Sequence, residues 1–254
     1  MLSKFLVTLA ASASGALAAT PAGFEPGSQT SLLVTFGNVA AQDGVVVAKD
    51  ITQTAPTIAT QSKLDGTSFA VLMIDLDIPT DSPPQTNTLL HWLQEGLTQS
   101  SSAVPLNTTM GSTSAFVLVV PGDEAYAPYL GPAPPARIPL SHRYTQIVVD
   151  TSDVSGAGLD ALKAAAATRM GFNAQSVLTA AGLADKVVAG NFFNVTNPGP
   201  VSVPTASNST TGGGSGTNST NSPSQVPVPT AAGSQQASAS ILAIVMIAVA
   251  YFTL

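Results

Sequence analysis

Short runs of β-branched and apolar residues, separated by turn residues, dominate the first 150 residues of the chain. These runs predict strands, because β-branched side chains favour extended backbone and Gly, Pro, Asn and Asp favour turns. Six strands are expected, at residues 31–36, 45–48, 69–74, 89–93, 115–120 and 144–149.

Two later segments have a helical pattern instead. Residues 158–170 carry leucines and a series of alanines at 3.6-residue spacing. Asn173 can cap a second helix that runs to about Ala181, where Gly182 can end it. The strands come first and the helices last, without βαβ alternation. This order predicts a mainly β fold, with an antiparallel β-sheet core and peripheral α-helices.

The N-terminal end has a different pattern from this middle part. Lys4 precedes an apolar stretch at residues 5–17, and small residues follow it. This layout is typical of a secretory signal peptide over residues 1–18, cleaved after Ala18 or Ala19. A buried N-terminal helix is the alternative.

The C-terminal end is typical of a glycosylphosphatidylinositol (GPI) attachment signal. Small residues at 230–234, a polar spacer and the apolar tail 241–254 follow one another in the order that such a signal requires. The tail is short for a bilayer span of about 20 residues, and no charged residue after Lys186 could hold a membrane helix in place. We therefore expect an exported protein, GPI-anchored at the plasma membrane or cell wall with the tail removed, and a retained membrane helix is the alternative. The candidate attachment residues are Ala231, Ala232 and Gly233.

Residues 196–240 are rich in Ser, Thr, Gly, Pro and Asn. Such a segment has too few large apolar side chains to offset the entropy of ordering, so it is expected to be a disordered stalk behind a domain at 20–195. In a secreted chain, asparagines in Asn-x-Ser/Thr sequons are candidate glycosylation sites. They are Asn107, Asn194, Asn208 and Asn218.

Composition excludes several functions. Only 9% of the 254 residues are charged, and eight Lys and Arg against fourteen Asp and Glu cannot form a basic face for nucleic acid. Since cysteine is absent, there is no disulfide framework, thiolate metal site or cysteine nucleophile. No G-x-S-x-G nucleophile elbow occurs, so we do not expect an enzyme. Metal-dependent hydrolysis by Asp and His residues is the catalytic alternative.

Two aspartates and the only two histidines stand out in this charge-poor domain. Asp75 and Asp77 follow the apolar run 69–74, and extended backbone places both carboxylates on one face, about 7 Å apart. His91 and His142 lie in or next to expected strands. Together, these side chains would suit an anionic or phosphate-bearing ligand, a metal ion or acid–base chemistry. Alternatively, the aspartates only cap turns and the histidines only fill the core.

Several motifs in this region resemble those of the phosphatidylethanolamine-binding protein family, in the family's order. Leu76 is a departure, because it stands where the first motif usually has proline. The matching segments are 75–79 (D-L-D-I-P against D-P-D-x-P), 90–93 (L-H-W-L), 129–135 (Y-x-G-P-x-P-P), 141–144 (x-H-R-Y), 169–173 (R-x-x-F-N) and 188–193 (V-A-G-N-F-F).

The resemblance implies a large antiparallel sheet and a small pocket for phosphate or phosphoethanolamine-type head groups, with no cofactor and no metal. Because consecutive side chains of a strand point to opposite faces, Arg143 should point away from a pocket that His142 lines. We expect Arg143 to support Asp75 or Asp77 through an ion pair, unless it is a plain surface charge. The implied ligand-binding residues are Asp75, Asp77, Pro79, His91, Pro134 and His142.

We therefore expect a non-catalytic cell-surface binding module whose partner is a phosphate-bearing small molecule or a phospholipid head group. The resemblance leaves two alternatives. One is an inhibitor of a serine carboxypeptidase, because the family includes the carboxypeptidase Y inhibitor. The other is a structural surface glycoprotein with a vestigial pocket.

Overall fold

The computed structural model of the chain describes residues 19–197 and residue 199. The expected signal peptide, the attachment residues and almost all of the stalk, with the sequons at Asn208 and Asn218, lie outside this part. Within it, no helix is long and apolar enough to cross a membrane.

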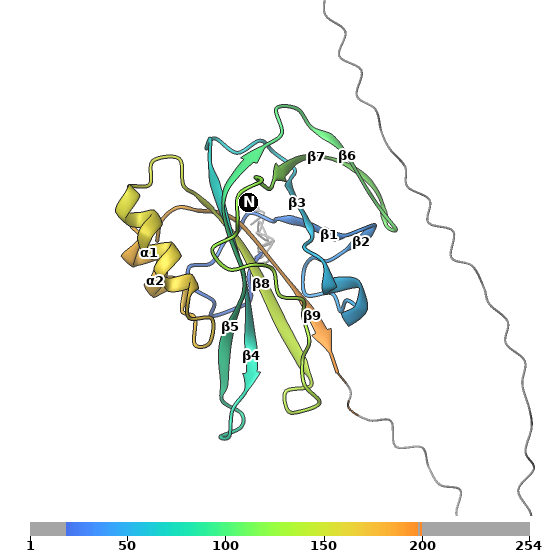
Figure 1. The fold of residues 1–254 in the computed structure, drawn as a ribbon. Coiled ribbons are helices and arrows are strands. Elements are labelled where there is room, and N and C mark those ends of the chain that lie inside the picture. The colour runs from blue at the N-terminus through green and yellow to red at the C-terminus, as the bar shows by residue number, and fades with distance from the viewer. Residues whose placement is uncertain (1–18, 198, 200–254) are drawn as a thin grey trace, which may run out of the picture. The chain divides into compact units, whose positions relative to one another are not determined.

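In the described residues, nine strands form one curled sheet in which every neighbouring pair is antiparallel (Figure 1). The order is β2-β1-β3-β7-β5-β4-β8-β9, and β6 pairs with β7. A short 3-10 helix, η1 (Lys49–Gln53), lies between β2 and β3. The strands are β1 (Leu33–Phe36), β2 (Val39–Ala40), β3 (Thr57–Thr60), β4 (Phe69–Pro79), β5 (Thr86–Gln99), β6 (Val104–Thr108), β7 (Gly111–Val119), β8 (Ser141–Asp150) and β9 (Val187–Thr196).

The central strand β4 separates two apolar cores. Phe69, Val71 and Met73 belong to one core, whereas Leu72 and Ile74 belong to the other. This alternation follows from the period of two in a strand, and it explains why the sequence of β4 is apolar without interruption. The second core also holds the helices α1 (Gly156–Ala166) and α2 (Ala174–Ala180), which lie together on one side of the sheet (Figure 1).

The helix starts follow local capping chemistry. Ser155 Oγ accepts a hydrogen bond from Gly158 N at 3.1 Å, and Asn173 Oδ1 accepts one from Ser176 N at 2.8 Å. The structure therefore has the Asn173 cap that the sequence predicts. The first helix ends at Ala166, four residues before the predicted end.

The early end of α1 has a tertiary cause. Leu90 N donates a hydrogen bond to Arg169 O at 2.9 Å, and Met170 forms a bridge with Leu89. These contacts tie the segment after α1 to β5, so it cannot continue the helix.

Strand β9 was not among the predicted strands, because Gly190 and Asn191 lower its strand propensity. It pairs with β8 on one side, and the N-terminal segment lies along its other side. Leu32 N donates to Gly190 O at 2.7 Å, and Gly190 N donates to Thr30 O at 2.9 Å. A Cβ at position 190 would lie 2.5 Å from Thr20 Cγ2, so only glycine allows this close approach.

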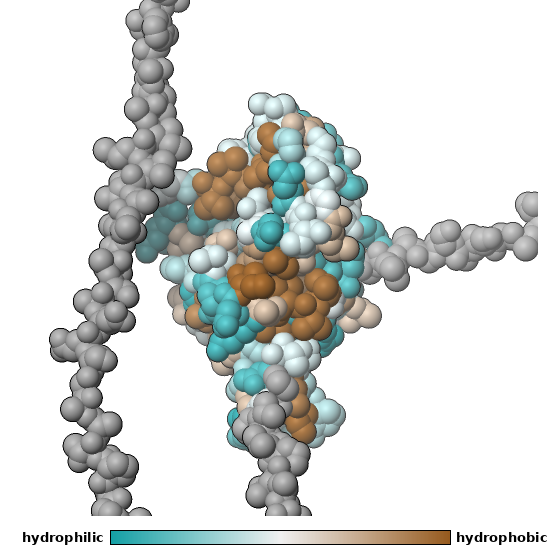
Figure 2. Space-filling model, turned by 90° about the vertical axis from the view of Figure 1, so that its right-hand side faces the viewer, coloured by the Kyte–Doolittle hydropathy of each residue, from teal (hydrophilic) through white to brown (hydrophobic). Residues whose placement is uncertain are grey.

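The predicted strand at 45–48 is absent from the structure, where Val46 forms only an isolated bridge with Asn194. The short strands β2, β3 and β6 were not predicted either. Some large side chains stay exposed, among them Val46 and Ile51. Apolar surface gathers in the middle of the face seen in Figure 2 and is bordered by polar side chains.

Candidate functional site

A small cavity of about 120 Å³ lies between strands β4, β5 and β8 and the loop at 130–135. Ligand pockets for drug-sized molecules measure roughly 300–1,000 Å³, so this cavity can admit only a small chemical group. Its lining residues are Asp75, Ile78, Leu89, His91, Leu130, Gly131, Ala133, Pro134, Pro135, His142 and Tyr144.

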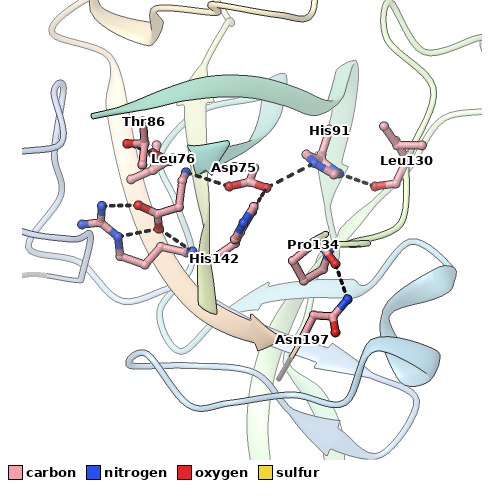
Figure 3. A network of polar contacts seen from close by, with 10 residues as sticks. Asp75, Leu76, Thr86, His91, Leu130, Pro134, His142 and Asn197 are labelled. Atoms are coloured by element: carbon pink, nitrogen blue, oxygen red, sulfur yellow. Dashed lines mark hydrogen bonds and ion pairs between the residues drawn. The ribbon is translucent and has the colours of Figure 1, made fainter. Parts of the chain in front are cut away.

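Asp75 is the buried centre of the polar side of this cavity (Figure 3). The sequence predicted that strand β4 ends at residue 74, before the aspartates, but the strand is longer in the structure. It continues to Pro79, and Asp75 pairs with Tyr144 in the sheet. One carboxylate oxygen, Oδ1, accepts a hydrogen bond from Asp77 N at 2.8 Å. The other, Oδ2, lies 2.8 Å from His142 Nδ1 and 4.0 Å from His91 Nε2. The fold thus gathers three of the predicted ligand-binding residues.

The tautomer of His91 follows from its partner. Its Nδ1 lies 2.7 Å from the carbonyl oxygen of Leu130, and a carbonyl can only accept, so Nδ1–H is the donor. In the neutral ring, Nε2 therefore carries the lone pair. Burial lowers the pKa of His91, and the contact with Leu130 and the charge of Asp75 offset this only in part. Near neutral pH, His91 thus presents a hydrogen-bond acceptor.

Three buried polar atoms around the cavity have no hydrogen-bond partner among the described residues. They are Nε2 of His91, Nε2 of His142 and the hydroxyl of Tyr144. The Tyr144 ring lies edge-on to His91, with centroids 5.1 Å apart, and stacks on His142 at 6.5 Å. Burial raises the pKa of Tyr144, so its hydroxyl stays protonated. Since buried polar atoms are normally paired, these atoms mark a place for a small polar group.

Asp77, which was also predicted to bind the ligand, is not among the residues that line the cavity. A register shift between Asp75 and Ile78 interrupts the regular alternation along β4, and Asp77 binds Arg143 instead. Arg143 Nη2 donates to Oδ1 at 2.7 Å, while its Nε and backbone N donate to Oδ2, each at 2.8 Å. Burial opposes ionisation of Asp77, but the hydrogen bonds and charge of Arg143 outweigh it and lower the pKa.

Arg143 thus forms the ion pair that the sequence left open between Asp75 and Asp77. Because His142 and Arg143 are consecutive in β8, their side chains point to opposite faces of the sheet. His142 lines the cavity on one face, and Arg143 holds Asp77. The hydrogen bonds to Asp77 raise the pKa of Arg143 further. The ion pair supports the strand from which Asp75 reaches the cavity.

The two predicted prolines lie in different places. Pro79 is the last residue of β4, pairs with Thr86, and is outside the cavity lining. Pro134 does line the cavity, and its carbonyl accepts a hydrogen bond from Asn197 Nδ2 at 2.8 Å (Figure 3). Strand geometry accounts for the position of Pro79, since Ile78 lines the cavity and the next side chain in a strand points to the opposite face.

Sequence reasoning missed the residues that hold the loop wall in place. Arg169 donates through Nη2 to Pro128 O at 2.7 Å and through Nη1 to His91 O at 3.2 Å. Gln53 Nε2 donates to Pro132 O at 2.9 Å. Arg169 belongs to the motif at 169–173 and Tyr144 to the motif at 141–144, so the family motifs could have pointed to both. No local pattern pointed to Gln53 or to Asn197.

The described residues hold no group of three or more His, Cys, Asp or Glu side chains arranged to bind a metal ion. The two sequons in this part differ from each other. Asn107 is exposed on β6, whereas Asn194 on β9 donates through Nδ2 to Gly44 O at 2.6 Å.

These features of the described residues define the class: a mainly β protein with a curled antiparallel sheet, two helices on one side and a small cavity with one polar side between β4, β5 and β8. The chain belongs to the phosphatidylethanolamine-binding protein family, whose sequence model matches residues 28–193. The expected fold class is thereby confirmed for the described residues.

Individual relatives share less than a third of their aligned residues with this chain. Phomoidride biosynthesis cluster protein N of Talaromyces stipitatus is 29% identical over 208 residues, which cover 76% of this chain and 96% of that protein. Among solved structures, carboxypeptidase Y inhibitor in complex with its cognate proteinase has 18% identity and a TM-score of 0.45, covering 66% of this chain and 83% of that one. The phosphatidylethanolamine-binding protein of Plasmodium vivax has 19% identity and a TM-score of 0.43, covering 65% and 84%.

Proposed function

We propose that this protein is a non-catalytic binding module that takes a phosphate-bearing group, free or as a lipid head group, into the cavity of Asp75, His91 and His142. The observation that carries the proposal is the set of three buried, unpartnered polar atoms around a cavity of about 120 Å³. Leaving such atoms unpaired is costly. A phosphate group can pair with both donors and acceptors, because its oxygens accept hydrogen bonds and a P–OH donates one.

The cavity's size and chemistry support binding over catalysis. At about 120 Å³ the cavity is smaller than the pockets of drug-sized ligands, so the remainder of a larger ligand stays outside, against the apolar rim of Ile78, Leu89 and Leu130. The lining contains no Ser, Thr, Cys or Lys. The one lining hydroxyl, that of Tyr144, has a raised pKa, which makes it a poor nucleophile.

Titration calorimetry with phosphoethanolamine tests the proposal. Ala133 is an exposed residue of the cavity lining whose side chain carries no polar atom, so Ala133→Phe blocks entry without removing a polar side chain of the Asp75 network. Ala136 is exposed in the same loop but outside the lining, and Ala136→Phe is the matched control. We expect binding to wild type and to A136F, and at least tenfold weaker binding to A133F and to His142→Ala. Equal affinity in all four proteins would refute the site.

We further propose that the module acts at the cell surface, held by a GPI anchor. The apolar N-terminal segment with its small-residue end and the uncharged C-terminal segment with its apolar tail support this. Treating intact cells with phosphatidylinositol-specific phospholipase C should release the protein into the medium. If it stays on the cells and needs detergent for extraction, the anchor proposal is wrong.

A further inference from the structure

The two histidines of the cavity have opposite hydrogen-bonding capacities. His91 uses Nδ1–H for the Leu130 carbonyl, and its Nε2 lone pair remains. His142 directs Nδ1 at the carboxylate of Asp75, which stabilises an imidazolium in the way that a buried aspartate does in a catalytic triad. His142 can thus hold an extra proton on Nε2, whereas His91 has no carboxylate within hydrogen-bond distance.

We propose that a bound phosphate group enters this cavity together with a proton, which His142 takes up from solution at Nε2. The inference rests on the proposed function, because it concerns the same cavity. The protonated Nε2–H and the Tyr144 hydroxyl then donate to the anion. The His91 Nε2 accepts, so it favours a ligand that offers a donor, such as the P–OH of a singly ionised phosphate monoester.

The charges around the two rings favour this proton uptake. From β4, Asp75 places a negative charge beside both rings, so an anion that entered alone would add a second. The nearby positive charge of Arg143 is already paired with Asp77. Behind His91, Arg169 donates hydrogen bonds to backbone carbonyls, and its positive charge makes protonation of His91 less favourable still. A proton on His142 therefore balances the anion.

The remaining neighbours carry no compensating charge. Tyr144 on β8 stays neutral, and β9 places the apolar Phe193 against its ring, with centroids 5.5 Å apart. His142 pairs in the sheet with Val195 of β9, and the loop wall lines the cavity with leucine, glycine, alanine and proline. Since burial strengthens charge interactions, a proton on His142 would balance the charge of the anion directly.

Two phosphate esters test the proton uptake by His142 and the hydrogen bond to His91 separately. Dimethyl phosphate stays singly ionised near neutral pH and has no P–OH, so any proton taken up on binding goes to the protein. Methyl phosphate as the monoanion has one P–OH. Calorimetry in buffers of different ionisation enthalpy, from pH 5.5 to 8.5, measures protons bound per dimethyl phosphate. We expect the uptake to rise toward one proton per bound dimethyl phosphate. At the acid end of the pH range, methyl phosphate should bind about tenfold tighter than dimethyl phosphate.

Asparagine variants assign the roles, because an asparagine amide can replace Nδ1–H and removes Nε2. His142→Asn keeps the donor to Asp75, and its residual binding should proceed without proton uptake. His91→Asn keeps the donor to Leu130, and it should retain the uptake but lose the preference for methyl phosphate. Unchanged circular dichroism and melting temperature show that each variant is folded.

The outcomes distinguish the two proposals. If neither probe binds to wild type, the proposed function fails, and this inference fails with it. If both probes bind without proton uptake at any pH tested, only the inference fails. It also fails if His91→Asn abolishes the uptake while His142→Asn preserves it.

Discussion

Replacing Arg143 by methionine removes the partner of a buried carboxylate and keeps most of the side-chain volume. Asp77 then loses two of the three hydrogen bonds that Arg143 supplies and keeps only that from the backbone N–H. Breaking a fully buried ion pair costs about 3–5 kcal/mol, whereas exposed pairs contribute about 0–1 kcal/mol. The Asp77 side chain is 9% exposed and that of Arg143 is 41% exposed. Discounted for this solvent exposure, the expected loss is about 2 kcal/mol.

The stability that Arg143→Met loses should become smaller as the pH falls. In the wild type, the pKa of Asp77 is lowered, so its contribution to stability is complete above the unfolded value of about 3.9 and is lost as pH falls through the lower folded value. In Arg143→Met, burial acts without Arg143 and raises the pKa of Asp77. The difference in stability between the two proteins should therefore be large at pH 7 and shrink as pH falls toward 3.

Thermal unfolding followed by circular dichroism measures both effects. A loss of about 2 kcal/mol in a domain of this size lowers the melting temperature by roughly 4–8 °C. Arg137→Met is the matched control, because Arg137 and its partner Asp81 are both exposed and 3.5 Å apart, and it should leave the melting temperature unchanged. The reasoning is refuted if R143M melts like wild type at pH 7, or if its deficit is the same at pH 3.5.

Further predictions concern helix packing and glycosylation. Gly158→Ala should destabilise the protein, because the new Cβ would lie 2.6 Å from the Ala181 carbonyl oxygen. Gly156→Ala in the same helix meets open space and should stabilise the protein by about 0.5–1 kcal/mol. Chemical denaturation measures the stability of both variants, and equal effects would contradict the packing argument. In a secreting eukaryotic host, Asn107→Gln should remove one glycan by mass spectrometry. Asn194→Gln should remove none, because its amide is engaged inside the fold; a glycan at Asn194 would contradict this.

Most of the site could be predicted from the sequence because charged and titratable residues are scarce in this chain. Asp75, His91 and His142 stood out for that reason, the motifs supplied Pro134, and the structure brings all four to one cavity. Asp77 differs from these four residues, because it lies outside the cavity lining. Its position two residues from Asp75 suggested a shared pocket, but a register shift and a partner 66 residues away place it outside the lining.

What the sequence determined by itself is local: five of the six predicted strands, the Asn173 cap, the two helical segments and the family motifs. Tertiary structure decided the rest. Gly190 makes a poor strand residue until β8 and the N-terminal segment pair with β9 on both sides. Likewise, His91 becomes an acceptor only because a carbonyl 39 residues away takes its Nδ1–H. Hydrogen bonds between distant segments and the burial they create set these properties, and no local pattern encodes such partners.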